Sequence, residues 1–599
     1  MKNVLKRVLC ALFSAAILLS LFAGCAKSPA ESQQEQPAAA GQTDEPQDQT
    51  DEAPEQTNDG TQESGTTDQP DEQQPEESNP NIPTSAEVIT MTPQDIMAAG
   101  CVNNFAKTVD GYPVDLNLPL ADETATLTAW MGWGGYFSAA IDTPNDSTAM
   151  KTAEDLTNVH VEWTLSNDAA TQFPLLLASG DFTDIYMSSG DISKLPNYAD
   201  EEIIADLTDY IAADAPNYTA LCKDDPDVAR RSKTDDSRQL VMFGILTVPS
   251  VTWLAHVSRA DWLNGADPVT YDDYYEVLKS FRDDEACPAP LNIAINGQDT
   301  FFMAGYDVGT SWINLDGTVE HSITQPGYRD YIQTMRTWYA EKLIDPNFYG
   351  RTNGVSFDYA LTASGEIGMW SLPYQFFALV ETFAEDPDFE LVGVRPPVRQ
   401  EGDVRKIQLS SATTRIMSNY GAVFSTCSDI ALAVRYFDFW FTPQGAMLAA
   451  YGNEGEGFYY DENGIPQVTE AILHPADPGI TSNMARNALI ADFFPNLMDW
   501  TRDMKAGMSK NALNATTIWD YNWVDSISMP TLTLTAEESE EYSRIMSDVE
   551  TRINESIPKF ITGELSMDTW DAFVEELIAM GLPEAQQIEQ AAFDRFMAR

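Results

Sequence analysis

The chain has 599 residues and a formal net charge of −59, with 93 acidic and 34 basic side chains. A chain this acidic repels nucleic acid and anionic lipid head groups, so we expect no nucleic-acid partner and a ligand that is neutral or cationic. A solvated acidic surface without any ligand preference is the plainer reading of the same charge. The length exceeds one ordinary core and predicts two or more domains.

The first 24 residues have the pattern of a secretory signal. Three basic residues precede an apolar run over residues 8–22, and small residues lead up to Cys25. The run is shorter than the about 20 apolar residues that a spanning helix needs. Its end resembles a bacterial lipobox, with Phe22 where leucine is commonest. This resemblance implies a signal peptide over 1–24 and a lipid anchor on Cys25 at the outer face of the cell membrane; the alternative is an ordinary signal peptide that contains a cysteine.

Residues 25–84 are predicted to be a disordered acidic tether. They contain almost no aliphatic or aromatic residue, and residues 31–80 hold 15 acidic and no basic side chains. Such a segment cannot bury enough apolar surface to offset the entropy of ordering. A lead-in segment of mixed polarity follows over residues 85–120.

The folded body begins with a strand–helix–strand pattern. Residues 125–130 alternate as a strand does, residues 159–163 form a second strand candidate, and an apolar helix ending at Gly180 leads into a third strand at 185–187. This spacing favours a parallel α/β sheet. Residues 420–450 are predicted to form a strand followed by a helix.

Several helices are well marked further along. Thr270 caps one with Asp273 at its third position, and Thr535 caps another with Glu538. Three further helices are predicted from apolar stripes and a glycine stop, over residues 328–339, 570–578 (stopped at Gly581) and 584–596.

The residue types that carry catalysis or metal binding are scattered. The four histidines, His160, His256, His321 and His474, show no metal-ligand spacing, and the chain has no nucleophile elbow, phosphate loop or calcium loop. We therefore predict no metal, no cofactor and no enzyme activity. Cysteines 101, 222, 287 and 427 show no paired spacing, so lone buried thiols are expected, although the sequence does not fix their pairing.

Six segments follow one another between residues 125 and 599 in the order of a known family. They are residues 177–185 (LASGDFTDI), 259–263 (RADWL), 339–346 (YAEKLIDP), 365–369 (GEIGM), 451–457 (YGNEGEG) and 560–564 (FITGE). The ordered set resembles the extracellular solute-binding lipoproteins of family 1, in particular the large oligosaccharide-binding branch of Gram-positive bacteria. Thr183 and Lys342 stand where that group has proline and glycine.

The resemblance implies a type 2 periplasmic-binding-protein fold, in which two α/β lobes joined by a hinge close on a ligand. Lobe 1 would take residues 121–255, lobe 2 residues 256–415, and residues 416–599 would return to lobe 1 and end in helices. It also implies a monomer that captures a carbohydrate, an oligosaccharide, and delivers it to the permease of an ABC importer. Peptide or cationic ligands stay open within the family.

Ligand-binding residues are expected just after strands, because ligands of open α/β sheets bind beyond the carboxyl ends of the strands. Aromatic rings would cover sugar faces, and carboxylates or amides would bind the hydroxyls. The alternative role of each aromatic candidate is packing in the core, and the alternative role of Asp181 is capping of a turn. The candidates are Trp133, Tyr136, Phe137, Asp181, Trp253, Trp370, Ser371, Tyr374, Trp519 and Trp523.

Two other functions remain as alternatives. A surface hydrolase or lyase acting on glycans would use a pair of carboxylates, whose separation the sequence does not give. A lipoprotein that captures glycans without importing them would share every feature described above.

Overall fold

The computed structural model describes residues 109–599 except for a set of short gaps. The gaps are residues 133–140, 190–191, 193, 248–251, 352–354, 357, 408, 410–413, 463, 476–481, 500–501, 503–508, 520–523 and 525. The predicted signal peptide, the tether with Cys25 and most of the lead-in lie outside the described residues. Four candidate ligand residues, Trp133, Tyr136, Phe137 and Trp523, lie outside them too.

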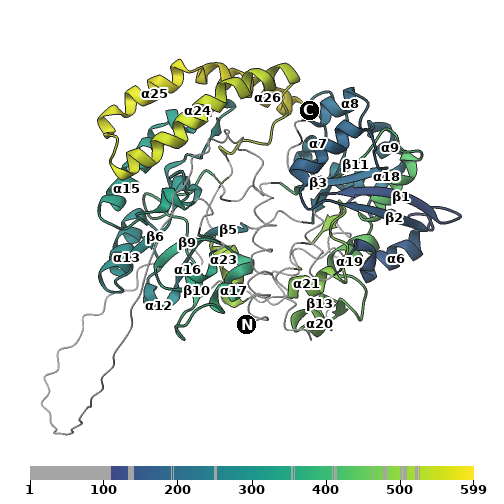
Figure 1. Ribbon diagram of the computed structural model, residues 1–599, viewed down its shortest axis with the longest axis horizontal. Coiled ribbons are helices and arrows are strands. Elements are labelled where there is room, and N and C mark those ends of the chain that lie inside the picture. The colour runs from purple at the N-terminus through teal and green to yellow at the C-terminus, as the bar shows by residue number, and fades with distance from the viewer. Residues whose placement is uncertain are drawn as a thin grey trace, which may run out of the picture.

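Two lobes lie side by side, each built on its own sheet (Figure 1). The hydrophobic core of lobe 2 shares no residue with the two clusters that form the core of lobe 1. Each lobe therefore buries its own apolar surface, as separate domains do.

Lobe 1 contains a six-stranded sheet in the order β14-β4-β11-β3-β1-β2. All of its strands run in one direction except β11, which is antiparallel to both of its neighbours. The strands predicted at 125–130, 159–163 and 185–187, and their parallel pairing, are confirmed. The strands are β1 (Ala125–Met131), β2 (Val159–Leu165), β3 (Ile185–Ser189), β4 (Met242–Leu246), β11 (Ile416–Val423) and β14 (Leu497–Met498).

Helices cover both faces of this sheet. The predicted stop of α7 at Gly180 is confirmed, with Gly180 in the left-handed conformation at φ 71°. The helices are α6 (Thr148–Thr157), α7 (Ala169–Ser179), α8 (Leu195–Asp200), α9 (Thr208–Asp214), α10 (Pro216–Asp224), α11 (Pro226–Arg231), α18 (Ile430–Phe439), α19 (Pro443–Tyr451), α20 (Glu470–Leu473) and α21 (Ser482–Asn487). A small hairpin of β12 (Phe458–Tyr460) and β13 (Pro466–Val468) adjoins them.

The prediction of one helix after the strand at 420–450 was wrong, because two helices follow β11. Pro443 cannot continue α18, since it has no backbone N–H to donate. It instead starts α19, and the Thr442 hydroxyl caps that helix by accepting from the N–H of Gly445 at 3.0 Å.

Lobe 2 contains a four-stranded sheet in the order β10-β5-β9-β6, where β9 is parallel to β6 and antiparallel to β5. The capping box of Thr270 and Asp273 at the start of α13 is confirmed. The strands are β5 (Leu254–Arg259), β6 (Ala289–Leu291), β9 (Ile367–Pro373) and β10 (Leu391–Gly393), with a separate hairpin of β7 (Trp312–Leu315) and β8 (Thr318–His321). The helices are α12 (Ala260–Leu263), α13 (Tyr271–Asp283), α14 (Thr300–Met303), α15 (Pro326–Ala340), α16 (Tyr359–Ala363), α17 (Phe377–Glu381) and α23 (Lys510–Trp519).

The last three helices pack on lobe 2 and end beside lobe 1 (Figure 1). They are α24 (Ala536–Thr562), α25 (Trp570–Ala579) and α26 (Leu582–Ala598), and the capping box of Thr535 and Glu538 is confirmed. Gln590 of α26 ties this helix to the β7–β8 hairpin by accepting from the N–H of Val319 at 2.7 Å. The end of the chain reaches Asp235 in lobe 1.

Candidate ligand-binding site

The carboxyl edges of the two sheets define where a ligand would bind. In lobe 1 the strands β1, β2, β3, β4 and β14 end at the same edge. The chain then passes to lobe 2, because β4 ends at Leu246 and β5 begins at Leu254 in the other sheet. In lobe 2 the ends of β6 and β9 and the start of β5 share one edge. Ligands of open α/β sheets lie at such edges.

Trp253 and Tyr374 meet at the carboxyl edge of lobe 2. The N–H of Tyr374 donates to the carbonyl oxygen of Trp253 at 3.1 Å, since Leu254 of β5 pairs with Pro373 of β9. The indole N–H of Trp253 donates to Oε1 of Gln375 at 3.0 Å. Trp253 is half-buried, whereas Tyr374 is buried. The structure therefore brings two of the predicted residues together and adds Gln375, which the sequence analysis missed although it directly follows Tyr374.

Trp370 and Trp519 lie in the core of lobe 2, and neither exposes any surface. Trp370 belongs to β9, both faces of which are buried. Trp519 packs at the end of α23, and its indole N–H donates to the carbonyl oxygen of His256 at 3.0 Å. Ser371 pairs with His256 across the sheet and is half-buried. Both tryptophans therefore stabilise the lobe in this conformation and present no ring face to a ligand.

Asp181 lies away from the carboxyl edge of lobe 1. It stands between α7 and the start of β3, and therefore at the opposite edge of the sheet. Its N–H donates to the Ser179 hydroxyl at 3.2 Å, as in a turn that closes a helix. This hydrogen bond uses the backbone N–H, and the Asp181 side chain is exposed, so its role in ligand binding stays a prediction.

Gly132 is the first residue of the glycine-rich stretch that follows the first strand in the sequence. It directly follows β1 at the carboxyl edge, and a Cβ atom on it would lie 2.9 Å from Cβ of Ala169 at the start of α7. Glycine is therefore needed for α7 to begin this close to the strand. The loop residues 133–140 are outside the described part of the chain, so Trp133, Tyr136 and Phe137 stay predictions.

A groove of about 570 Å³ lies farther along the carboxyl edge of lobe 2. Ile295 and Asn296 follow β6, Tyr349 follows α15, and the last turns of α24 form the other wall. This groove was not predicted from the sequence. The signals that could have found it are the Asn-Gly turn at 296–297, after a short apolar strand, and the aromatic pair at 348–349, just after the 339–346 segment. Its lining residues are Ile295, Asn296, Tyr349, Asn554, Glu555, Pro558, Lys559, Thr562 and Glu564.

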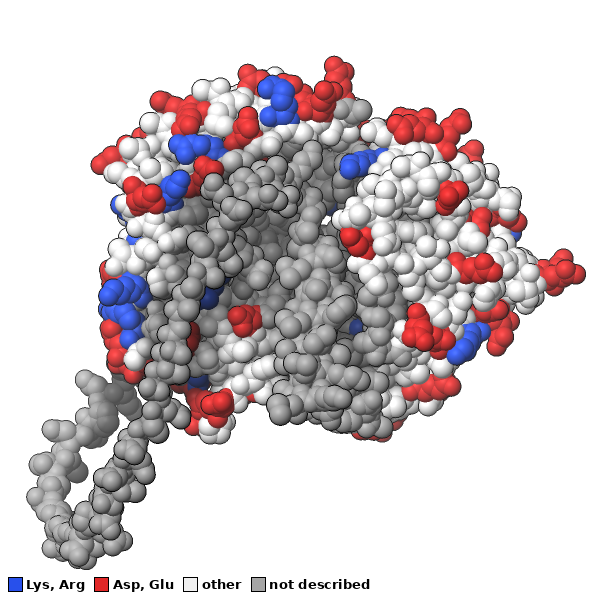
Figure 2. All heavy atoms as spheres, in the orientation of Figure 1, with Lys and Arg blue, Asp and Glu red and all other residues white. Residues whose placement is uncertain are grey.

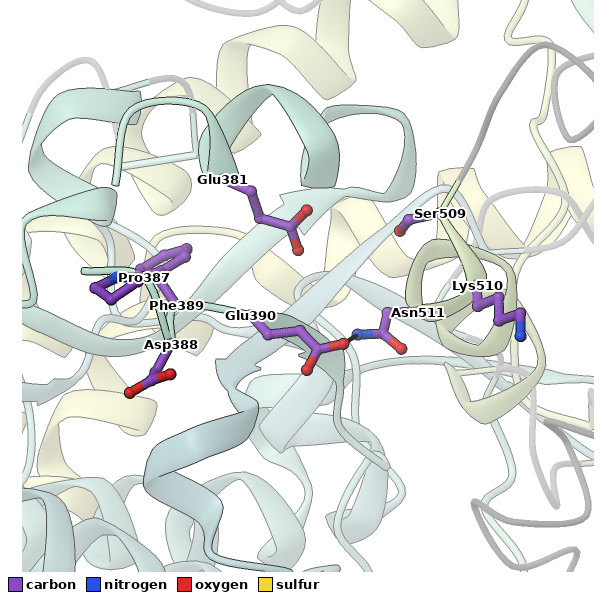
Figure 3. A pocket seen from close by; sticks show the side chains of 8 residues that line it. All are labelled: Glu381, Pro387, Asp388, Phe389, Glu390, Ser509, Lys510 and Asn511. Carbon is purple, nitrogen blue, oxygen red and sulfur yellow. Dashed lines mark hydrogen bonds between the residues drawn. The ribbon is translucent and has the colours of Figure 1, made fainter. Parts of the chain in front are cut away.

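A second hollow, of about 460 Å³, is acidic and lies at the other edge of the sheet (Figure 3). Glu390 precedes β10, whose first residue Leu391 pairs with Arg259 at the end of β5. Glu390 accepts from Nδ2 of Asn511 at 2.8 Å, and Glu381 accepts from the N–H of Leu391 at 3.1 Å. These carboxylates are engaged in holding β10 and α23, so this hollow is not the ligand site we favour.

Acidic side chains are spread over both lobes on the face shown in Figure 2, and basic ones accompany them on the C-terminal helices. This distribution disfavours anionic ligands. Within the described residues, no group of three or more His, Cys, Asp or Glu side chains is arranged to hold a metal ion. No helix in the described part of the chain is both long and apolar enough to cross a bilayer.

Comparison with known proteins supports a solute-binding fold. No protein-family model matches the chain. The chain is similar to the fructooligosaccharide ABC transporter substrate-binding protein FusA of Streptococcus pneumoniae serotype 4, with 21% identity over 489 residues, which are 76% of this chain and 88% of FusA.

Solved structures match with similar coverage. Alginate-binding protein AlgQ2 without calcium ion matches with a TM-score of 0.60 and 22% identity over 80% of this chain and 100% of AlgQ2. An HMO-binding, ABC-transporter-associated solute-binding protein of Bifidobacterium longum infantis matches with a TM-score of 0.61 and 16% identity over 79% of this chain and 99% of that one. The chain therefore has the two-lobed type 2 periplasmic-binding-protein fold, and the resemblance to extracellular solute-binding proteins of family 1 is confirmed.

Proposed function

We propose that this protein is a solute-binding protein that captures a neutral oligosaccharide outside the cell and delivers it to an ABC importer. In this proposal it acts as a monomer, is held at the membrane by a lipid on Cys25, and performs no chemistry on its ligand. The observation that carries the proposal is the half-buried ring of Trp253 beside Gln375 at the carboxyl edge of lobe 2. An aromatic face beside an amide suits a sugar ring and its hydroxyls. The similarity to FusA supports the same ligand class.

The proposed mechanism is closure of the lobes about the segments that connect them. A ligand held by residues of both lobes binds the closed form more tightly than the open form, and it shifts the population toward closure by that difference in affinity. The permease would then recognise the closed form. On this view Trp253, beside the crossing from β4 to β5, contributes from the lobe 2 side, and the 133–137 loop contributes from lobe 1.

A thermal-shift panel with product analysis tests this function. Kestose, nystose, milk oligosaccharides and alginate oligosaccharides are each incubated with the purified protein, and the glycans are then analysed by mass spectrometry. A receptor for neutral glycans shows a higher melting temperature with one neutral series, because ligand binding stabilises the native state, and it returns the glycans uncut. Shortened or eliminated products would establish a hydrolase or lyase instead. Absence of any shift with every neutral series would overturn the proposal.

A further inference from the structure

The groove at Tyr349 continues the edge that carries Trp253 and Tyr374. Leu291 of β6 pairs with Met369 of β9 on one side and forms a parallel bridge with Ile344 on the other. The segment after Ile344 therefore leaves the sheet at the same carboxyl edge as the segments after β6 and β9. Tyr349 thus lies along one edge from Tyr374, beyond the end of β6.

The groove combines the groups that bind sugars. The Tyr349 ring is 50% exposed and packs edge-on against buried Phe348, with ring centroids 5.3 Å apart. Ile295, which is 42% exposed, and Pro558 add apolar surface. An aromatic face with apolar neighbours and a few convergent polar groups is typical of a small-molecule site.

Two amides supply directed polar groups. Oδ1 of Asn554 accepts from Nε2 of Gln298 at 3.0 Å and from Nδ2 of Asn296 at 3.4 Å. These contacts fix the orientation of the Asn554 amide, and its Nδ2 group donates to no described residue. The carboxylates of Glu555 and Glu564 are exposed at the rim and can accept from hydroxyls. With Lys559 as the one base among the lining residues, the lining disfavours an anionic sugar.

The groove is held in shape by buried contacts. Asp345 is 1% exposed, and its carboxylate accepts from Nε of Arg351, from Nδ2 of Asn292 at 3.0 Å and from the N–H of Asn347 at 2.9 Å. On the other wall, Gly297 has φ 73°, a left-handed conformation that favours glycine, and a Cβ on it would lie 2.6 Å from Cδ1 of Ile561 in α24. A site that is already formed loses less entropy when it binds.

We propose that this groove is a distal sugar subsite, which binds the far end of an oligosaccharide whose nearer units lie at Trp253. The inference depends on the proposed function, because it needs a glycan at the carboxyl edge of lobe 2. It adds that the protein selects for chain length. A short oligosaccharide reaches only the Trp253 region, whereas a longer one also places a ring on Tyr349 and gains affinity.

Calorimetric titration of a length series tests this proposal. Kestose, nystose and size-fractionated inulin-type chains, with milk oligosaccharides of matched length as a second series, are titrated into wild type and Tyr349→Ala. We expect wild type to bind longer chains of one series more tightly. Tyr349→Ala should lose about tenfold in affinity for the longer chains and keep the affinity for the trisaccharide unchanged, whereas Tyr349→Phe should keep both, because the ring face is retained.

The matched control is Tyr459→Ala. Tyr459 is 51% exposed on the β12–β13 hairpin of lobe 1 and should have no effect on any titration. If wild type binds the series and Tyr349→Ala lowers the affinity for short and long chains equally, or for neither, the distal subsite is overturned while the proposed function stands. If wild type binds neither series, the proposed function itself fails.

Discussion

The Nε atom of Arg595, near the end of α26, lies 2.7 Å from Oδ2 of Asp235 in lobe 1. Arg599 adds a second contact, from Nη2 to Oδ1 of the same carboxylate at 2.5 Å. Because the first part of α26 packs in the core of lobe 2, these pairs tie the two lobes together at the end of the chain, beside the Phe596 ring, which lies under Arg230 and Arg231 of α11. Arg599 is nearly buried, with 3% of its side chain exposed.

Replacing Asp235 should therefore destabilise the protein. Asp235→Ala leaves the Arg599 guanidinium nearly buried without its carboxylate, which should lower the free energy of unfolding by about 2 kcal/mol. We also expect the ligand-free protein to become more extended. Denaturant unfolding and small-angle X-ray scattering measure the two effects.

The control for the ion pairs of Asp235 is Glu576→Ala. Glu576 pairs with Arg552 at 2.9 Å within the C-terminal helices, where 33% of the Arg552 side chain and 48% of the Glu576 side chain are exposed. Exposed pairs contribute between 0 and about 1 kcal/mol, so this variant should stay close to wild type and keep its dimensions. Equal losses in the two variants would mean that Asp235 has no special role between the lobes.

Trp253 and Trp519 should respond differently to substitution. Trp253→Ala removes the half-buried ring at the carboxyl edge. It should weaken binding of nystose by about tenfold or more. If another neutral glycan of the panel is the one that raises the melting temperature, the same loss is expected for that glycan. Trp519→Phe removes the hydrogen bond to the His256 carbonyl and should lower stability by about 1 kcal/mol with no change in affinity. Calorimetry and thermal melting of both variants separate the two roles. An affinity loss confined to Trp519→Phe would reverse our assignment.

The local signals of the sequence predicted the elements well, and the site residues less well. Thr270 and Thr535 cap their helices because a capping box depends on four consecutive residues. Trp370 could not be placed from sequence, because β9 is buried on both faces and so lacks the alternation that separates core from surface. The groove at Tyr349 was equally hidden, because one of its hydrogen bonds joins Asn296 to Asn554, 258 residues apart.

His321 should make stability depend on pH. It is 2% exposed, packs against Trp312, and burial lowers its pKa to about 4. In the unfolded chain the histidine has its ordinary pKa near 6.5. As the pH falls from 6.5 towards 4, the unfolded state therefore binds a proton that the folded state does not bind, and the free energy of unfolding decreases. The full effect corresponds to about 3 kcal/mol.

His321→Asn tests this origin of the acid sensitivity. In the wild type, the N–H of Ile323 donates to Nδ1 of His321 at 3.3 Å. Asparagine keeps an acceptor for this N–H, and its side chain does not titrate. Unfolding free energies of both proteins are measured between pH 7.5 and 4.5. We expect wild type to lose more stability than the variant across this range, and parallel curves would show that His321 does not contribute.

Gly393 should be intolerant of a side chain because α23 packs directly on β10. A Cβ at this position would lie 2.6 Å from Cβ of Ala515 and 3.1 Å from Nε1 of Trp519. Gly393→Ala must therefore push α23 outward and weaken the bond from Trp519 to His256, which should cost about 1–3 kcal/mol, the usual range for overpacking a core.

Gly350→Ala is the control, since nothing lies within 4 Å of its Cβ position. Thermal unfolding should show a clear loss for Gly393→Ala and almost none for Gly350→Ala. If Gly393→Ala were as stable as wild type, α23 would be free to shift on β10, and the close packing of α23 against Gly393 would not contribute to stability.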